Sequence, residues 1–189
     1  MGTGQREIPI VDWAIVPAAL PLPGACGRRT IPAMKTDYAA VVAAPGFCLG
    51  VRCDEDEITG IDYLEPRAEA APKTALAKET VRQLRAYLRD PSFEFRLPLA
   101  PAGTAFQRRV WERIAAVPPG QVRTYGELAA ALKSGPRAVG NACGANPYPL
   151  VVPCHRVVAA GGGLGGFGRN RGGFLLEVKS RLLEHEGKR

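Results

Sequence analysis

The stretch Leu150-Val-Val-Pro-Cys-His-Arg-Val-Val158 sets a cysteine and a histidine side by side inside a strongly apolar run. Thiolate is the reactive form of cysteine, and a nearby imidazole or positive charge lowers the thiol pKa or takes its proton. We expect residues 147–158 to be extended, so that adjacent side chains point to opposite faces. Contact between Cys154 and His155 would then need a turn or a bridging water. The pair alone leaves two interpretations open, a nucleophilic site and two buried structural residues.

A catalytic imidazole also needs a third group to orient it, usually a carboxylate. Glu186, beside the last expected helix, is the candidate, and a solvated carboxylate at a helix end is the alternative. We expect His185 to be structural or exposed. Cys143 should line a substrate pocket beside Cys154, or pack near such a pocket, rather than react.

Helical patterns precede this stretch. Residues 104–107, Thr-Ala-Phe-Gln, have the form of a capping box at a helix start, and Pro118-Pro119-Gly120 ends that helix. A second short helix fits residues 125–132, a turn fits 134–136, and a third helix should run from about 136 to 143. Two short helices joined by a tight turn that contains glycine indicate a helix-turn-helix.

The N-terminal half has a different pattern. Short apolar or alternating runs at 38–43, 47–53 and 58–64 predict a β-meander, followed by a helix that Asp90-Pro91 stops. Residues 93–97 are expected to add a strand. The predicted fold is an α/β N-terminal subdomain (small sheet plus helix, 36–99) followed by a mostly α-helical C-terminal subdomain with a helix-turn-helix (100–189). Residues 1–35, rich in Pro and Gly, are expected to be a poorly ordered extension.

Composition and charge narrow the class of protein. No apolar run is long enough to span a bilayer and no signal peptide is visible, so we expect a soluble, cytoplasmic monomer. Residues 1–103 hold 12 Lys/Arg against 13 Asp/Glu, whereas residues 104–189 hold 13 against 5. The C-terminal half therefore suits a polyanionic partner, although a solvated basic face is equally compatible with charge alone.

The five cysteines form no CxxC pair, and the chain has only two histidines, which makes a zinc site unexpected. Cys48 and Cys53 could bond if the segment between them bends. In a reducing cytoplasm two free thiols are the stronger expectation.

The motif Pro153-Cys-His-Arg-Val157 resembles the signature of the O6-alkylguanine-DNA alkyltransferase family. The resemblance continues at residues 106–111, 124–129, 137–140, 146–147 and 182–187. It covers roughly residues 100–187 and extends more weakly over 37–99.

The resemblance implies that Cys154 takes an alkyl group from O6 of guanine in double-stranded DNA, with O4 of thymine as a further candidate position. It implies no cofactor and one turnover per molecule. His155 would act as a base through a water, and Glu186 would hold its tautomer. Three further residues carry over as catalytic: Asn146, Tyr125 and Lys179. For the last two, core packing and an ordinary solvated lysine are the alternatives.

The resemblance also implies a DNA-binding surface and a pocket. Arg137 would fill the gap left in the base stack by the extruded nucleotide, or contact only phosphate. Tyr125 would contact the flipped nucleotide. Ala138, Ala142 and Gly144 would keep the third helix slim in the minor groove. The stretch 169–173 is a few residues longer than in shorter relatives, and from its charge we expect Arg169 and Arg171 to contact DNA phosphate; a pocket lid and a flexible loop are the alternatives. The expected substrate pocket comprises Pro149, Val157, Leu164, Gly165, Phe167, Gly168 and Cys143.

Two positions depart from the family pattern. Phe167 stands where tyrosine is usual, and Gly168 stands where a hydroxyl residue often lies near O6. Three rival functions remain: an alkyltransferase-like protein that binds without reacting, a helix-turn-helix regulator, and a cysteine hydrolase. The retained Cys154 counts against the first, and the intact motif counts against the second. The third would need no DNA. The sequence shows no cysteine-rich N-terminal module, which favours a stand-alone repair protein over a combined repair protein and activator.

Overall fold

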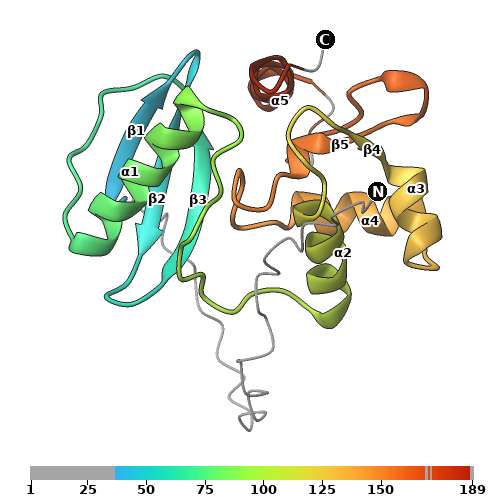
Figure 1. Ribbon diagram of the computed structural model, residues 1–189, viewed down its shortest axis with the longest axis horizontal. Helices are drawn as coiled ribbons and strands as arrows, with labels where there is room; N and C mark the ends of the chain where they lie inside the picture. Colours follow the sequence, from blue (N-terminus) through green and yellow to red (C-terminus); the bar gives the residue numbers. More distant parts are fainter. Residues whose placement is uncertain (1–36, 169, 171, 188–189) are drawn as a thin grey trace, which may run out of the picture.

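The computed structural model describes residues 37–168, 170 and 172–187 (Figure 1). The predicted extension over residues 1–35 and the two loop arginines, Arg169 and Arg171, lie outside the described residues. The described chain forms a small sheet with one helix, followed by a mostly helical part, as the sequence predicts. None of its described helices is long and apolar enough to cross a membrane.

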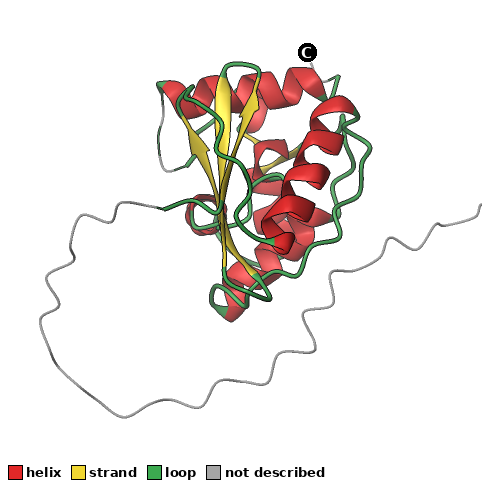
Figure 2. Ribbon diagram, turned by 90° about the vertical axis from the view of Figure 1, so that its left-hand side faces the viewer, coloured by secondary structure: helices red, strands yellow, loops and turns green. Residues whose placement is uncertain are grey.

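The first part is the predicted β-meander. Strands β1 (Ala40–Ala44), β2 (Phe47–Cys53) and β3 (Ile58–Leu64) pair antiparallel in that order and lie side by side in Figure 2. Helix α1 (Ala75–Arg89) begins at Thr74, whose side chain accepts a hydrogen bond from the Ala77 amide. Its buried positions are Ala77, Thr80, Val81, Gln83, Leu84 and Tyr87. This face contributes to the core beneath the sheet.

The strand expected at residues 93–97 is wrong. The side chain of Gln83 binds both backbone groups of Arg96, donating to its carbonyl and accepting from its amide at 2.8 Å each. A side chain on α1 therefore satisfies backbone groups that a ladder would otherwise pair. The connecting segment meets β3 only through an isolated bridge between Ile58 and Leu99.

The second part contains the predicted helix-turn-helix. Helix α2 (Ala105–Ala115) begins with the expected capping box at Thr104 and Gln107. Helices α3 (Tyr125–Ala131) and α4 (Pro136–Gly144) follow, joined by a tight turn. Helix α5 (Phe174–His185) closes the described chain and lies between the two parts in Figure 1.

The segment over residues 147–158 is not extended, contrary to the expectation. The Val152 amide donates to the Tyr148 carbonyl at 2.8 Å, and the 3-10 helix η2 (Cys154–Arg156) follows. Strand pairing is confined to β5 (Val157–Val158), which runs parallel to β4 (Arg123–Thr124). The turns bring Cys154 and His155 into a compact helical arrangement instead of setting them on opposite faces of a strand.

One hydrophobic core joins the two parts. It includes Ile61 from β3, Trp111 from α2, Cys154 from η2 and Leu182 from α5. The amide of Ile61 also donates to the Pro147 carbonyl at 2.9 Å. The sheet is therefore fixed directly against the loop that precedes the reactive cysteine.

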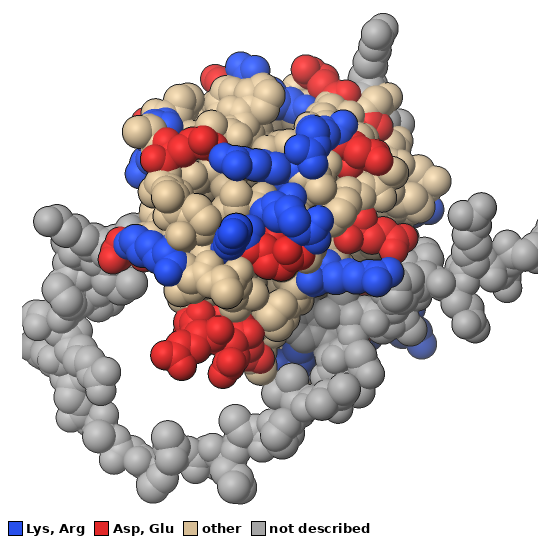
Figure 3. Space-filling model, turned by 60° about the vertical axis from the view of Figure 1, so that its left-hand side comes forward, with Lys and Arg blue, Asp and Glu red and all other residues tan. Residues whose placement is uncertain are grey.

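The surface on the sheet side has no single sign of charge. Lys/Arg and Asp/Glu side chains are interspersed on the face shown in Figure 3. Two exposed ion pairs of this part join Arg82 to Glu79 at 2.6 Å and Arg85 to Glu69 at 3.1 Å. The excess of positive charge belongs instead to residues 104–189.

Candidate active site

Cys154 begins η2, and its side chain is almost completely buried. Asn146 fixes the turn ahead of it, since its side chain donates to the Val152 carbonyl at 2.8 Å and accepts from the Tyr148 amide at 3.0 Å. Burial raises the pKa of the Cys154 thiol, while a hydrogen bond from Asn146 and the charge of Lys179 act in the opposite direction. The thiol is therefore protonated at rest and needs a group that takes its proton.

His155 is fully buried, with Nε2 3.0 Å from Oε1 of Glu186. Burial lowers the pKa of His155, although the hydrogen bond and charge of Glu186 oppose this. A neutral imidazole beside a carboxylate carries its proton on Nε2, which leaves Nδ1 as an acceptor. Within the described part of the chain, Nδ1 has no hydrogen-bond partner. The imidazole is thus oriented by Glu186 with its basic nitrogen free.

Glu186 is the centre of a buried network. Besides His155, it accepts hydrogen bonds from Arg156 at 2.7 and 2.9 Å and from the Tyr87 hydroxyl at 2.7 Å. Burial alone would raise the pKa of Glu186, but the hydrogen bonds and nearby charges bring it well below its ordinary value. The side chain has no exposed surface, so the alternative of a solvated carboxylate is wrong.

Lys179 is fully buried on α5. Its ammonium group donates to the carbonyls of Val157 at 2.6 Å and Gly166 at 3.3 Å, and also to that of Leu164. Burial lowers the pKa of Lys179 to about 8, against the influence of Cys154 and Cys143. The alternative of a solvated lysine is wrong, because this side chain holds the glycine-rich loop (residues 161–168) against β5 and α5.

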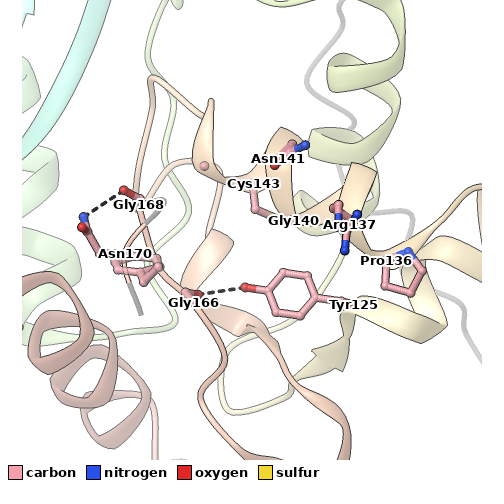
Figure 4. A pocket seen from close by; sticks show the side chains of 11 residues that line it. Tyr125, Pro136, Arg137, Gly140, Asn141, Cys143, Gly166, Gly168 and Asn170 are labelled. Atoms are coloured by element: carbon pink, nitrogen blue, oxygen red, sulfur yellow. Dashed lines mark hydrogen bonds between the residues drawn. The ribbon is translucent and has the colours of Figure 1, made fainter. Parts of the chain in front are cut away.

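A pocket of about 350 Å³ opens between α4 and the glycine-rich loop (Figure 4). The Tyr125 hydroxyl crosses it to donate to the Gly166 carbonyl at 2.9 Å. Its lining residues are Tyr125, Pro136, Arg137, Gly140, Asn141, Cys143, Gly144, Gly166, Phe167, Gly168 and Asn170. The pocket is lined by residues of both helices of the helix-turn-helix, α3 and α4.

The predicted pocket residues divide into two groups. Cys143, Phe167 and Gly168 line the pocket, as do three residues predicted for DNA binding or catalysis, Tyr125, Arg137 and Gly144. Pro149, Val157, Leu164 and Gly165 are not among the lining residues. Ala138 is half-buried on α4, and Ala142 is buried there with its carbonyl accepting from Trp111 Nε1 at 2.9 Å.

The sequence did not single out five of the lining residues: Pro136, Gly140, Asn141, Gly166 and Asn170. Gly140 and Asn141 lie three and four residues after Arg137 on α4, so helical periodicity could have indicated a shared face. Nor did it assign a role to Arg156, Tyr87 or Tyr63. The two tyrosines belong to the sheet part and reach the site only through tertiary packing, for which the sequence carries no local signal.

The two departures from the family pattern have structural consequences. Phe167 is buried, with its ring centroid 5.5 Å from that of Tyr63 and 5.6 Å from the Lys179 ammonium. Gly168 has φ +55°, and a Cβ there would lie 2.5 Å from Cδ1 of Leu175. A hydroxyl residue at position 168 would therefore be strained and would require Leu175 to move.

Among the described residues, two further cysteines and a second histidine lie outside the pocket lining. Cys48 and Cys53 are both free, and no disulfide joins them. His185 Nε2 is 2.9 Å from the Tyr87 carbonyl, as expected for a structural residue. Among the described residues there is no cluster of His, Cys, Asp and Glu that could hold a metal ion.

Comparison with known proteins gives consistent matches. The sequence model of the 6-O-methylguanine DNA methyltransferase, DNA binding domain, matches residues 105–188. A methylated-DNA–protein-cysteine methyltransferase of Methanosarcina acetivorans is 42% identical over 158 residues, covering 79% of this chain and 98% of that protein. The regulatory protein ada of Salmonella typhimurium is 37% identical over 148 residues, covering 76% of this chain but only 40% of that longer protein.

A solved structure agrees with these sequence matches. The crystal structure of Mycobacterium tuberculosis OGT in complex with DNA aligns with a TM-score of 0.64 and 34% identity. The alignment covers 77% of this chain and 90% of that chain. On these identities and this coverage, the chain belongs to the methylated-DNA–protein-cysteine methyltransferase family.

Proposed function

We propose that this protein repairs double-stranded DNA by moving an alkyl group, above all methyl, from O6 of guanine to Sγ of its own Cys154. O4 of thymine is a second substrate position with the same chemistry. The observation that supports this most directly is the hydrogen bond between the buried His155 and Glu186, with His155 next to Cys154 in the chain. A pocket of about 350 Å³ opens at the helix-turn-helix; Tyr125 and Cys143 line it, and Cys154 itself is not among the lining residues. Cys154, His155 and Glu186 supply a nucleophile, a base and an orienting carboxylate, and the pocket can admit a flipped base.

The reaction is a displacement at the alkyl carbon. The Cys154 proton passes through a water to Nδ1 of His155, and Glu186 stabilises the resulting imidazolium through Nε2. The thiolate then attacks in line, so that the sulfur–carbon bond forms while the carbon–O6 bond breaks. The electron pair stays on the departing guanine, which finally regains one proton, so that the thiol proton is accounted for.

Tyr125 and Lys179 assist different stages of this step. Burial raises the pKa of Tyr125, so its hydroxyl remains a donor and can turn from the Gly166 carbonyl to the departing base. The Lys179 ammonium holds the loop that walls the pocket and favours thiolate on Cys154 electrostatically. Asn146 keeps the cysteine at the start of η2 through its two hydrogen bonds.

Access to the lesion requires extrusion of the nucleotide, because O6 of a stacked guanine is out of reach of a buried thiol. We infer that α4 enters the minor groove, since Ala138 and Gly144 keep its partly exposed side slim. The DNA-binding role expected for Ala142 is wrong, because this residue is buried in the core. Arg137, exposed at the pocket edge, then fills the gap in the base stack. Arg169 and Arg171 are inferred from their charge to contact phosphate. The relative solved with DNA supports a DNA partner.

The product is a thioether, which neither water nor thiols cleave under neutral conditions, so each molecule reacts once. We infer that the protein works as a cytoplasmic monomer associated with the nucleoid through DNA. Titration of a duplex containing O6-methylguanine should restore one guanine per protein molecule, measured by chromatography of the digested nucleosides. A Cys154→Ser variant should restore none. Restoration of many guanines per molecule would contradict self-alkylation and indicate a hydrolase.

A further inference from the structure

Two buried polar side-chain atoms have no hydrogen-bond partner within the described residues, the hydroxyl of Tyr63 and Nδ1 of His155. Native proteins keep few such atoms, because burying a polar group without a partner costs stability. Nδ1 already has a place in the proposed mechanism as the acceptor of the thiol proton. The hydroxyl of Tyr63, which comes from the other part of the molecule, has none.

The position of Tyr63 connects it to the active site. It lies on β3, where the amide of Ile61, two residues earlier, bonds the carbonyl of Pro147 next to Asn146. Its ring contacts the pocket residue Phe167 at a centroid distance of 5.5 Å. The strand thus meets the loop before Cys154 at Ile61 and the wall of the pocket at Tyr63.

The hydroxyl also interacts electrostatically with the reacting groups. Burial raises the pKa of Tyr63 well above its ordinary value, and the charges of Cys154, Tyr87 and Glu186 raise it further. A tyrosine with a raised pKa remains neutral and can donate a hydrogen bond at any pH that the protein tolerates. An anion on Cys154 is the group near it that forms during the reaction.

We propose that Tyr63 is a positioning residue of the proton relay, whose hydroxyl and His155 Nδ1 together hold the water that takes the proton from Cys154. This inference rests on the proposed function. The thiol proton moves to the water while a water proton moves to Nδ1, so the water is regenerated and the charge ends as thiolate and imidazolium. The Tyr63 hydroxyl donates to the water and fixes its lone pair toward the thiol. The α/β part of the chain thereby contributes to thiol activation.

The neighbouring Tyr87 shows the contrast. Its hydroxyl donates to Glu186 at 2.7 Å and is therefore satisfied by the protein itself. Tyr87 acts on the carboxylate side of the imidazole, whereas Tyr63 is assigned to the thiol side. The two tyrosines come from α1 and β3, so the active site is completed on both sides by the same subdomain.

The test compares Tyr63→Phe with Tyr38→Phe, a matched loss of a tyrosine hydroxyl from a half-buried site in the separate small cluster beside the sheet. Iodoacetamide modification of Cys154 is followed without DNA by peptide mass spectrometry from pH 6 to 10. We expect Cys154 of Tyr63→Phe to react at least about tenfold more slowly at pH 7, because the variant loses a hydrogen bond that favours the thiolate of Cys154. The rates should converge at high pH, where the thiol ionises without help.

Thermal unfolding separates this role from a structural one. A hydroxyl whose partner is a single water contributes little to the free energy of unfolding, so Tyr63→Phe should keep a Tm close to that of the wild type. Slower reaction with an unchanged Tm is the expected combination. Equal rates for wild type and Tyr63→Phe at every pH would overturn the proposal. So would a uniform loss at all pH values accompanied by a lower Tm.

A parallel assay of methyl transfer from duplex O6-methylguanine keeps the two proposals distinguishable. If the wild type takes no methyl group but Tyr63→Phe still displaces the pH profile of Cys154, the repair function fails and the relay stands. If the wild type is methylated and Tyr63→Phe matches it in both assays, only the assignment of Tyr63 fails.

Discussion

Oε1 of Glu186 lies 3.0 Å from Nε2 of His155, although the two residues are 31 positions apart in the chain. The same oxygen accepts from Tyr87, which is 99 positions away on α1. One carboxylate therefore fixes the tautomer of the base and ties the α/β part to the catalytic part. Its removal should affect both catalysis and folding.

Glu186→Gln is expected to slow methyl transfer and to destabilise the protein. The amide cannot compensate the buried Arg156 guanidinium, and breaking a buried ion pair costs about 3–5 kcal/mol. Stability is measured by urea unfolding and the transfer rate by quenched-flow sampling of the methylated duplex. Glu184→Gln is the control, since its carboxylate is exposed and, among the described residues, accepts a hydrogen bond only from Ser180 on the same helix, at 3.0 Å. Equal stability of the two variants would contradict the network.

Acid should destabilise the protein in two stages. The pKa of His155 is lowered from 6.5, so the unfolded chain binds a proton that the native chain does not, and stability falls as the pH drops below about 6.5. The pKa of Glu186 is lowered from 4.5, which adds a second decline below about pH 4.5. Urea unfolding at pH 7.5, 6, 5 and 4 measures both. A His155→Gln variant should lose the upper stage, and an unchanged profile would refute this assignment.

Lys179→Met should destabilise the protein by about 2–4 kcal/mol, because carbonyls that accept from the ammonium become unpaired in the core. It should also slow Cys154 modification at pH 7, since Lys179, with its pKa lowered to about 8, favours the thiolate. Urea unfolding and iodoacetamide kinetics provide the two measurements. Lys78→Met, an exposed lysine on α1, is the matched control. If both variants behaved alike, Lys179 would be no more than a packing residue.

Arg137→Ala should slow transfer from duplex DNA roughly tenfold, equivalent to about 1.4 kcal/mol, because the extruded state loses its support in the base stack. Transfer from a free O6-alkylguanine base, which needs no extrusion, should stay within about twofold. Arg113→Ala, an exposed arginine on α2, is the control. Equal losses of rate with both substrates would mean that Arg137 shapes the pocket and does not support the base stack.

Much of the fold follows from local patterns. The three runs of the meander, the capping box at Thr104 and the paired helices before the cysteine were predictable because caps, turns and periodicity act over a few residues. The segments that failed are governed by distant contacts. Residues 93–97 are satisfied by the Gln83 side chain, and the turn before Cys154 is held by Asn146.

The active site likewise contains residues that the sequence predicts and residues that only distant contacts bring to it. The motif at residues 153–157 identifies Cys154 and His155, and it implies Glu186 once the family is recognised. Nothing near Tyr63 or Tyr87 in the sequence marks either residue as part of the site, because an aromatic residue on a strand or an apolar helix face usually packs in the core. Only the folded arrangement shows the Tyr87 hydroxyl on Glu186, and the Tyr63 hydroxyl buried without a partner among the described residues while its ring packs on Phe167 of the pocket.

The central claim, self-alkylation at Cys154, is tested most directly by intact mass after incubation with duplex DNA carrying O6-methylguanine, with Cys154→Ala and Cys143→Ala alongside. We predict a single gain of one methyl group in the wild type and in Cys143→Ala, and no gain in Cys154→Ala. Tight binding of the lesion with no gain of mass in the wild type would contradict the account and leave a protein that recognises alkylguanine without repairing it.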